Sequence, residues 1–250
     1  MSLKQIILFI LLILTIIFSY TFYSLYRGPF LSNFCQLYDK TSKNKYGNLV
    51  RLLNNYDLCR KEKYNVFDKY IYWNGEIMAG VKNETLVFKG TDTLRDWSMD
   101  LSPTSHKLGN GKIYSDIISI YRDIESQLNP LHIKRVVGWS LGSILATIYS
   151  FERHTKYNDT MHEIILFGLP PAFDEKFHRE CDGILYHKTS VYNHKYDIFA
   201  HPFWFIGLPG LSKREDFYNV GKHIDAHYPK ANPYKIYYEG FAYYHLIYLR

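Results

Sequence analysis

The sequence predicts an α/β fold in which one sheet has flanking helices and is preceded by a single N-terminal transmembrane helix. Three observations support this prediction. Short β-branched segments alternate with longer segments whose apolar residues recur at helical spacing, as in a sheet with helices packed on it. The pentapeptide Gly-Trp-Ser-Leu-Gly at residues 138–142 joins one such strand to one such helix. Near the N-terminus, residues 5–26 contain no Asp, Glu, Lys or Arg.

The N-terminal segment predicts a membrane anchor. As a helix, its 22 uncharged residues rise ~1.5 Å each and can cross a hydrocarbon core of ~30 Å. A cleaved signal peptide is the alternative, but Ser19, Thr21 and Ser24 alternate with bulky aromatic residues where a cleavage site needs small ones. We therefore expect residues 1–27 to be an uncleaved signal-anchor of a single-pass membrane protein, and residues 28–250 to form the domain. The protein would be secreted if the segment is cleaved.

The first half of the domain predicts helices followed by an antiparallel hairpin. Residues 33–59 carry apolar side chains at helical spacing, so one or two helices are expected there. Residues 70–73 and 76–81 are joined by Asn74-Gly75, which is the preferred two-residue hairpin turn. A further turn leads into a strand at residues 85–88.

The second half predicts the buried part of the sheet. A helix is expected over residues 114–128, ending before an Asn-Pro pair. Residues 133–137 are β-branched and predict a strand, and the chain after the pentapeptide continues as a helix without Gly or Pro. Another buried strand is expected at residues 163–167, and the last clear strand at residues 184–193.

The composition excludes several functional classes. With 22% charged and 47% hydrophobic residues, the 250-residue chain resembles an ordinary globular protein. Its net charge of +6 is scattered rather than gathered in a basic block, so no nucleic-acid partner is expected, and no obligate protein partner is evident. The three cysteines form no Cys-x-x-Cys, and no His-Glu-x-x-His occurs, so we expect neither a metal nor a cofactor.

The pentapeptide predicts a nucleophilic serine at Ser140. A Gly-x-Ser-x-Gly sequence between a strand and a helix is typical of the nucleophile elbow, a sharp turn with the serine at its apex. The flanking Gly138 and Gly142 let backbone segments pass close together, and the following helix N-terminus supplies N–H groups beside the serine. A serine hydroxyl is a weak nucleophile by itself, so a histidine base and a carboxylate must complete the site.

Four stretches of the sequence share a characteristic order and spacing. They are Val87-Phe88-Lys89-Gly90-Thr91-Asp92 with the later Asp96-Trp97-Ser98-Met99-Asp100-Leu101, the pentapeptide at 138–142, Phe167-Gly168-Leu169-Pro170, and Asn193-His194-Lys195-Tyr196-Asp197-Ile198 followed by Pro202. Together they resemble the class 3 lipases, the fungal-type family within the α/β-hydrolase fold, over residues 70–202. The chain departs from the usual pattern at Lys89, Trp139 and Ser143, where the family has arginine, histidine and a second glycine. The resemblance implies an α/β-hydrolase sheet and a serine carboxylic-ester hydrolase.

The resemblance also implies roles for individual residues. Asp197 follows Ser140 as the carboxylate, in the chain order Ser, acid, His of α/β-hydrolases. The oxyanion hole would use the backbone N–H of Leu141, the residue after the nucleophile, and Thr91. Residues 93–100 match the lid of fungal members, although a helix packed on the core is an equal alternative.

Three histidines remain candidates for the base. His227, in an Asp-Ala-His sequence, resembles the Asp-x-His before a final helix in other members, and it is our first choice. His245, in His-Leu-Ile-Tyr, resembles the corresponding stretch of some fungal members, and His223 is the third candidate. His201 lies too close to Asp197 in sequence to fold back onto it.

The sequence therefore predicts a membrane-anchored lipase of the triacylglycerol type that cleaves lipid acyl esters. Ser140 would attack the acyl carbonyl, His227 would act as base and then as acid, and Asp197 would orient it. A phospholipase A or monoacylglycerol lipase on the same fold is one alternative. A non-catalytic, lipase-like membrane-associated protein is the other.

Overall fold

The computed structural model describes only part of the chain. Side chains are described for residues 46–47, 49–50, 52–53, 67–90, 104–159 and 161–193, and the backbone alone for residues 217–218 and 222–225. The chain divides into two compact units, Met1–Lys40 and Thr41–Arg250, and all described residues belong to the second. The expected membrane span thus lies outside the described residues. Among the helices that are described, none is long and apolar enough to span a bilayer.

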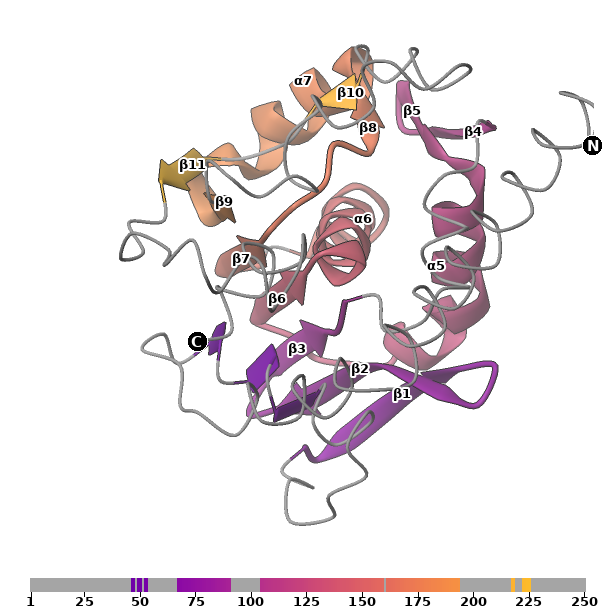
Figure 1. Cartoon of the computed structure of the whole chain (residues 1–250), viewed down its shortest axis with the longest axis vertical. Coiled ribbons are helices and arrows are strands. Elements are labelled where there is room, and N and C mark those ends of the chain that lie inside the picture. The colour runs from indigo at the N-terminus through magenta and orange to yellow at the C-terminus, as the bar shows by residue number, and fades with distance from the viewer. Residues whose placement is uncertain are drawn as a thin grey trace, which may run out of the picture. The chain divides into compact units, whose positions relative to one another are not determined.

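A seven-stranded sheet in the order β1-β2-β3-β6-β7-β9-β11 forms the centre of the described fold (Figure 1). Its strands are β1 Lys69–Trp73, β2 Glu76–Lys82, β3 Thr85–Phe88, β6 Arg135–Trp139, β7 Glu163–Phe167, β9 Thr189–Asn193 and β11 Lys222–Asp225. β2 is antiparallel to both β1 and β3, whereas β3, β6, β7, β9 and β11 are parallel to one another. These five strands therefore end at the same edge of the sheet, which we call the carboxyl edge.

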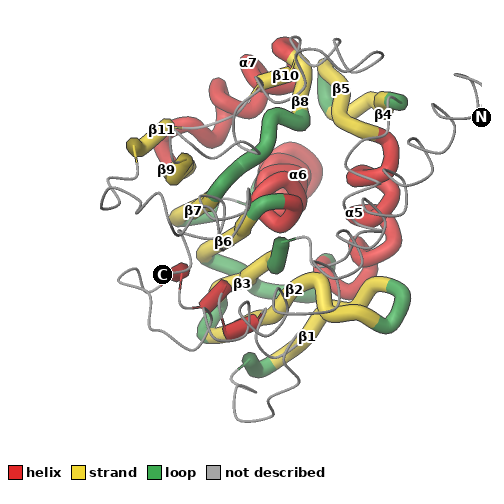
Figure 2. Tube along the Cα trace, in the orientation of Figure 1, coloured by secondary structure: helices red, strands yellow, loops and turns green. Residues whose placement is uncertain are grey.

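Helices pack on this sheet, as the alternating sequence pattern predicts. They are α5 Ser115–Leu128 and α6 Leu141–Tyr157. A third helix, α7 Glu175–Leu185, contacts α6 and is followed by the 3-10 turn η2 Tyr186–Lys188. Figures 1 and 2 show α6 against β3, β6 and β7, with α5 beside it. The first twelve residues of α6 are all buried, which explains why this helix begins with apolar and small residues on every side. Residues 46–47, 49–50 and 52–53 are helical, in agreement with the helices expected within residues 33–59.

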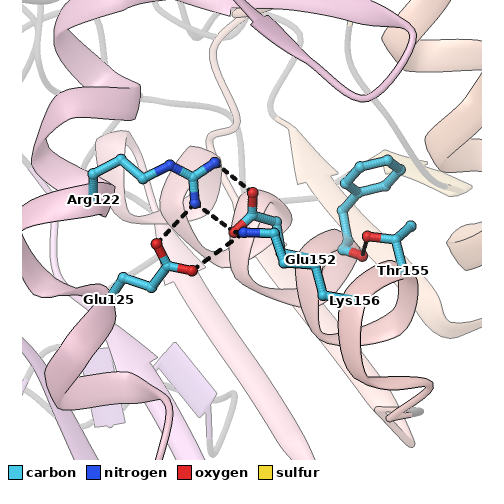
Figure 3. A network of polar contacts seen from close by, with 6 residues as sticks. Arg122, Glu125, Glu152, Thr155 and Lys156 are labelled. Carbon is cyan, nitrogen blue, oxygen red and sulfur yellow. Dashed lines mark hydrogen bonds and ion pairs between the residues drawn. The ribbon is translucent and has the colours of Figure 1, made fainter.

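An ionic cluster joins α5 to α6 (Figure 3). Arg122 on α5 donates to both carboxylate oxygens of Glu152 on α6, at 2.6 and 2.5 Å. Lys156 donates to the same carboxylate at 2.9 Å, and Glu125 accepts from both Arg122 and Lys156. Burial raises the pKa of Glu152, but hydrogen bonds from Arg122 and Lys156 outweigh it, so this pKa lies below its ordinary value.

A smaller antiparallel sheet, in the order β10-β8-β5-β4, was not predicted from the sequence. Its strands are β4 Ser105–Leu108, β5 Gly111–Tyr114, β8 Phe173–Asp174 and β10 Phe217–Tyr218. Three of the four residues in β4 are polar and exposed, and β8 and β10 have two residues each. Such short strands are too brief for an alternating pattern to emerge.

The strand predicted at residues 184–193 is wrong in its first half, because Leu185 ends α7 and β9 begins only after η2. The apolar residues Phe177, Cys181 and Leu185 are buried at four-residue spacing, which is a helical pattern set among charged residues. Asp174 caps this helix by accepting a hydrogen bond from the Phe177 N–H at 2.9 Å. β11 also lies beyond the last predicted strand. Its four residues include a single aliphatic one, so the sequence gives little strand signal there.

Candidate active site

Ser140 occupies the turn between β6 and α6, since β6 ends at Trp139 and α6 begins at Leu141. Its backbone has φ 55° and ψ −126°, a conformation that costs a residue other than glycine about 1–3 kcal/mol. The Ser140 N–H donates to the Phe167 carbonyl at 2.9 Å, and the Ser140 carbonyl accepts from the Ser143 N–H at 2.8 Å. Backbone hydrogen bonds on both sides thus hold the sharp strand-to-helix turn that the pentapeptide predicts.

The two glycines of the pentapeptide are required by close backbone contacts. A Cβ on Gly138 would lie 2.3 Å from the Gly142 carbonyl oxygen, and a Cβ on Gly142 would lie 2.2 Å from the Lys89 carbonyl oxygen. Real Cβ atoms do not come so close to backbone, so any larger residue would force the turn apart. The second contact also packs the first turn of α6 against the chain that follows β3.

The chain after β3 is fixed against the elbow, by which we mean residues 138–142. Phe88 at the end of β3 is in register with Gly138 on β6. A Cβ on Gly90 would lie 2.4 Å from the Trp139 ring, so the indole lies directly against the glycine backbone. Lys89 is 1% exposed and takes part in at least one interaction beyond the bond from its backbone N–H to the Met78 carbonyl.

The first N–H groups of α6 lie beside Ser140. Leu141 is the first helical residue and is 2% exposed. The helix itself supplies no acceptor for the N–H of its first residue, so this group can serve an external oxygen. Thr91, the second predicted oxyanion donor, follows Gly90 directly but lies outside the described residues.

Hydrogen bonds join two further predicted stretches, at residues 167–170 and 193–198, at the carboxyl edge. The Asn193 side chain at the end of β9 accepts from the Leu169 N–H at 3.0 Å and donates to the Leu169 carbonyl at 3.5 Å. Gly168, with φ 55°, donates from its N–H to the Tyr192 carbonyl at 3.0 Å. The structure thus gives Asn193 a positioning role that its place in the motif alone does not specify. Asp197 follows four residues later, outside the described residues.

The candidate histidines fall on both sides of the end of β11. This strand runs parallel to β9, and its last residue, Asp225, is in register with Asn193. His223 lies within the strand, whereas His227 follows its end by two residues. His227, His245 and the lid segment at residues 93–100 all lie outside the described residues. Of the predicted site residues and candidate bases, the structure therefore describes Ser140 and Leu141 with their side chains and the backbone of His223.

No metal centre emerges from this part of the chain. Among the residues whose side chains are described, no three His, Cys, Asp or Glu come together as metal ligands would. Among the described residues, Ser140 makes backbone hydrogen bonds to the Phe167 carbonyl and from the Ser143 N–H, and its carbonyl also accepts from the Ser143 hydroxyl. The N–H groups at the start of α6 are the donors that suit stabilisation of negative charge on a substrate oxygen.

The fold is similar to solved structures of fungal lipases. The triacylglyceride lipase of Rhizomucor miehei superposes with a TM-score of 0.50 at 14% identity, over 74% of this chain and 81% of that chain. A fungal lipase in complex with an inhibitor, the basis of a model for interfacial activation in lipases, gives 0.52 at 14% identity, over 76% and 78%. For a triacylglycerol lipase whose catalytic centre is a serine protease triad, the match has a TM-score of 0.43 at 16% identity and spans 59% of that chain.

No protein-family model and no curated protein sequence matches the chain. At the level of fold, the predicted resemblance is confirmed: the chain has the α/β-hydrolase fold of the fungal triacylglycerol lipases.

Proposed function

We propose that the chain is a serine ester hydrolase of the lipase type that cleaves the acyl esters of lipids. The observation that carries this proposal is the position of Ser140. It lies at a backbone turn with φ 55°, between a central parallel strand and the first N–H groups of a buried helix. A strained serine in this place, on a fold shared with lipases, is the arrangement used for acyl transfer through a covalent acyl-enzyme.

In the proposed reaction, Ser140 attacks the ester carbonyl and transfers its proton to a histidine. The carbonyl oxygen becomes negatively charged and accepts hydrogen bonds from Leu141 N–H and from Thr91. The histidine then protonates the departing alcohol, and water hydrolyses the acyl-enzyme by the same steps in reverse.

Strand order supports Asp197 as the carboxylate and His227 as the base. β9 and β11 are parallel neighbours on the same side of β6 in the sheet, and both end at the edge where Ser140 lies. Asp197 and His227 follow these strand ends by four and two residues. His223 lies inside β11 rather than beyond its end, which favours His227 over it.

We further propose that residues 1–27 anchor the domain to a membrane and that residues 93–100 form a lid over the site. The anchor would keep a lipid hydrolase at its substrate. Removing residues 1–27 should release the protein from membranes after carbonate extraction. If the complete chain is expressed and a soluble product with a new N-terminus beyond Ser19 is recovered, the segment is instead a cleaved signal peptide.

A histidine scan tests the proposed function. The full-length protein in detergent is assayed on a short soluble ester and on long-chain acyl esters, with Ser140→Ala, His223→Ala, His227→Ala and His245→Ala compared with wild type. We expect Ser140→Ala and His227→Ala to lose nearly all turnover, because serine without its base is barely nucleophilic. Full turnover in His227→Ala with loss in His245→Ala would reassign the base. An inactive wild type would favour the non-catalytic alternative.

A further inference from the structure

The carbonyl of Ser140 accepts two hydrogen bonds from a single residue of α6. The Ser143 N–H donates to it at 2.8 Å, and the Ser143 hydroxyl donates at 2.5 Å. Ser143 is fully buried, so water does not compete for this hydroxyl. The second bond exists because the chain has serine where the family pattern has a glycine.

Two other buried hydroxyls on α6 show why this contact is different. Thr147 donates to the Ser143 carbonyl at 2.9 Å, and Ser150 donates to the Ala146 carbonyl at 2.8 Å. Both bonds return to a carbonyl within the helix, four residues back, which is the common arrangement for hydroxyls in helices. The Ser143 hydroxyl reaches instead to Ser140, outside the helix and at the apex of the elbow.

The Ser140 carbonyl and the Leu141 N–H belong to the same peptide group. A trans peptide is planar, and its C=O and N–H point in opposite directions. A donor that fixes the direction of the carbonyl therefore fixes the direction of the N–H. Hydrogen bonds to the carbonyl also polarise the amide, which makes its N–H a stronger donor.

We propose that Ser143 is a positioning residue for the oxyanion hole. Its hydroxyl holds the peptide between Ser140 and Leu141 so that the Leu141 N–H faces the oxygen on which negative charge develops. Ser143 touches neither the substrate nor the reacting atoms, and it acts only through this peptide. The inference rests on the proposed ester hydrolysis at Ser140.

The test compares Ser143→Ala with Ser150→Ala in the full-length protein. Each substitution removes one buried hydroxyl that donates to a backbone carbonyl. For Ser143 this carbonyl belongs to the residue before α6, and for Ser150 it lies within α6. The measurements are kcat and KM on a short soluble ester, the inhibition constant of an alkyl trifluoromethyl ketone, and the thermal midpoint. The ketone is informative because addition of the Ser140 oxygen to its carbonyl carbon leaves an oxyanion, while the serine proton passes to the base.

We expect Ser143→Ala to lower kcat by about tenfold, less than the ~10²–10³-fold cost of losing an oxyanion donor itself. KM should stay unchanged and the inhibition constant of the ketone should rise by a similar factor, because the interaction is made only with the oxyanion. Ser150→Ala should change the thermal midpoint by about as much as Ser143→Ala does. It should leave kcat and the inhibition constant of the ketone unchanged.

Equal kcat and ketone affinity in Ser143→Ala and Ser150→Ala would overturn the inference and leave Ser143 a purely structural residue. This result leaves the proposed function standing if wild type hydrolyses the ester and Ser140→Ala does not. An inactive wild type would instead remove the proposed function, and the inference with it.

Discussion

The two ends of α6 have opposite effects on the stability of the molecule. At its start, the chain adopts a positive φ at Ser140, and the surrounding contacts are backbone hydrogen bonds and glycine contacts. In its second half, Glu152 and Lys156 join Arg122 and Glu125 of α5 in a partly buried ionic cluster (Figure 3). The elbow thus carries strain that the fold must compensate, while the ionic cluster contributes stability far from the candidate nucleophile. We infer that activity and stability are separable along one helix.

The largest effect is expected at the apex of the elbow. Ser140→Ala and Ser140→Gly should each lower turnover by on the order of 10⁴-fold or more, because both remove the nucleophile. Ser140→Gly should also raise the unfolding free energy above that of Ser140→Ala by about 1 kcal/mol, since glycine relieves the strain of a positive φ. Ester hydrolysis and denaturant unfolding measure the two effects. Equal stability of the two variants would show that the turn is not strained.

A smaller but still severe effect is expected from the contact between α6 and the chain after β3. Gly142→Ala places a Cβ 2.2 Å from the Lys89 carbonyl oxygen, and such overpacking should cost about 3 kcal/mol and most of the activity. The matched control is Gly183→Ala in α7, where an added Cβ meets nothing within 4 Å. This control should stabilise the protein by about 0.5–1 kcal/mol, because alanine favours helix. Tolerance of Gly142→Ala would mean that the two segments are not in close contact.

The ionic cluster should affect stability but not turnover. Glu152→Gln leaves Arg122 without its main carboxylate partner, and we expect a loss of about 2 kcal/mol, moderated by the partial exposure of Arg122. Turnover per folded molecule should be unchanged. The control is Glu175→Gln in the exposed pair with Arg179, where side chains are 53% and 76% exposed and the expected change is below ~0.5 kcal/mol. A large loss of kcat in Glu152→Gln would contradict the separation between the two ends of α6.

The smallest effect is a pH dependence of stability. The folded-state pKa of Glu152 lies below the ordinary value of 4.5. Its carboxylate therefore stabilises the folded state above that pH and loses this contribution as the pH falls through the folded-state pKa. The difference in unfolding free energy between wild type and Glu152→Gln should thus be constant near neutral pH and shrink below about pH 4.5. A difference that grows on acidification would reverse the assigned direction of the shift.

The sequence could predict those elements that have a clear local pattern. The hairpin around Asn74-Gly75, the strands of the parallel sheet from β3 to β7 and the helices α5 and α6 follow from local patterns, and the structure confirms them. The helix α7 was misassigned although Phe177, Cys181 and Leu185 recur at helical spacing, because the predicted strand at residues 184–193 overlapped its last residues. The small sheet and β11 were missed because their short strands depend on pairing with distant segments. Local patterns carry no information on such pairing.

For the candidate site, the sequence located the elbow because its chemistry lies in five consecutive residues. It identified Ser143 only as a departure from the family pattern and gave no pairing of Asn193 with Leu169, since the hydrogen bonds of both residues are seen only in three dimensions. The choice among His223, His227 and His245 also depends on where β11 ends in the sheet, which no motif encodes. The catalytic roles of Ser140, Asp197 and His227 and the oxyanion roles of Leu141 and Thr91 stay predictions.

Covalent labelling tests whether Ser140 is the nucleophile. The full-length protein is treated with a fluorophosphonate, digested and mapped by mass spectrometry, with Ser140→Ala and His227→Ala treated in parallel. We expect one adduct on Ser140, no adduct in Ser140→Ala and much slower labelling in His227→Ala, because the reagent reacts with a base-activated serine. An adduct on another serine, or ester hydrolysis by a protein that stays unlabelled, would show that Ser140 is not the nucleophile.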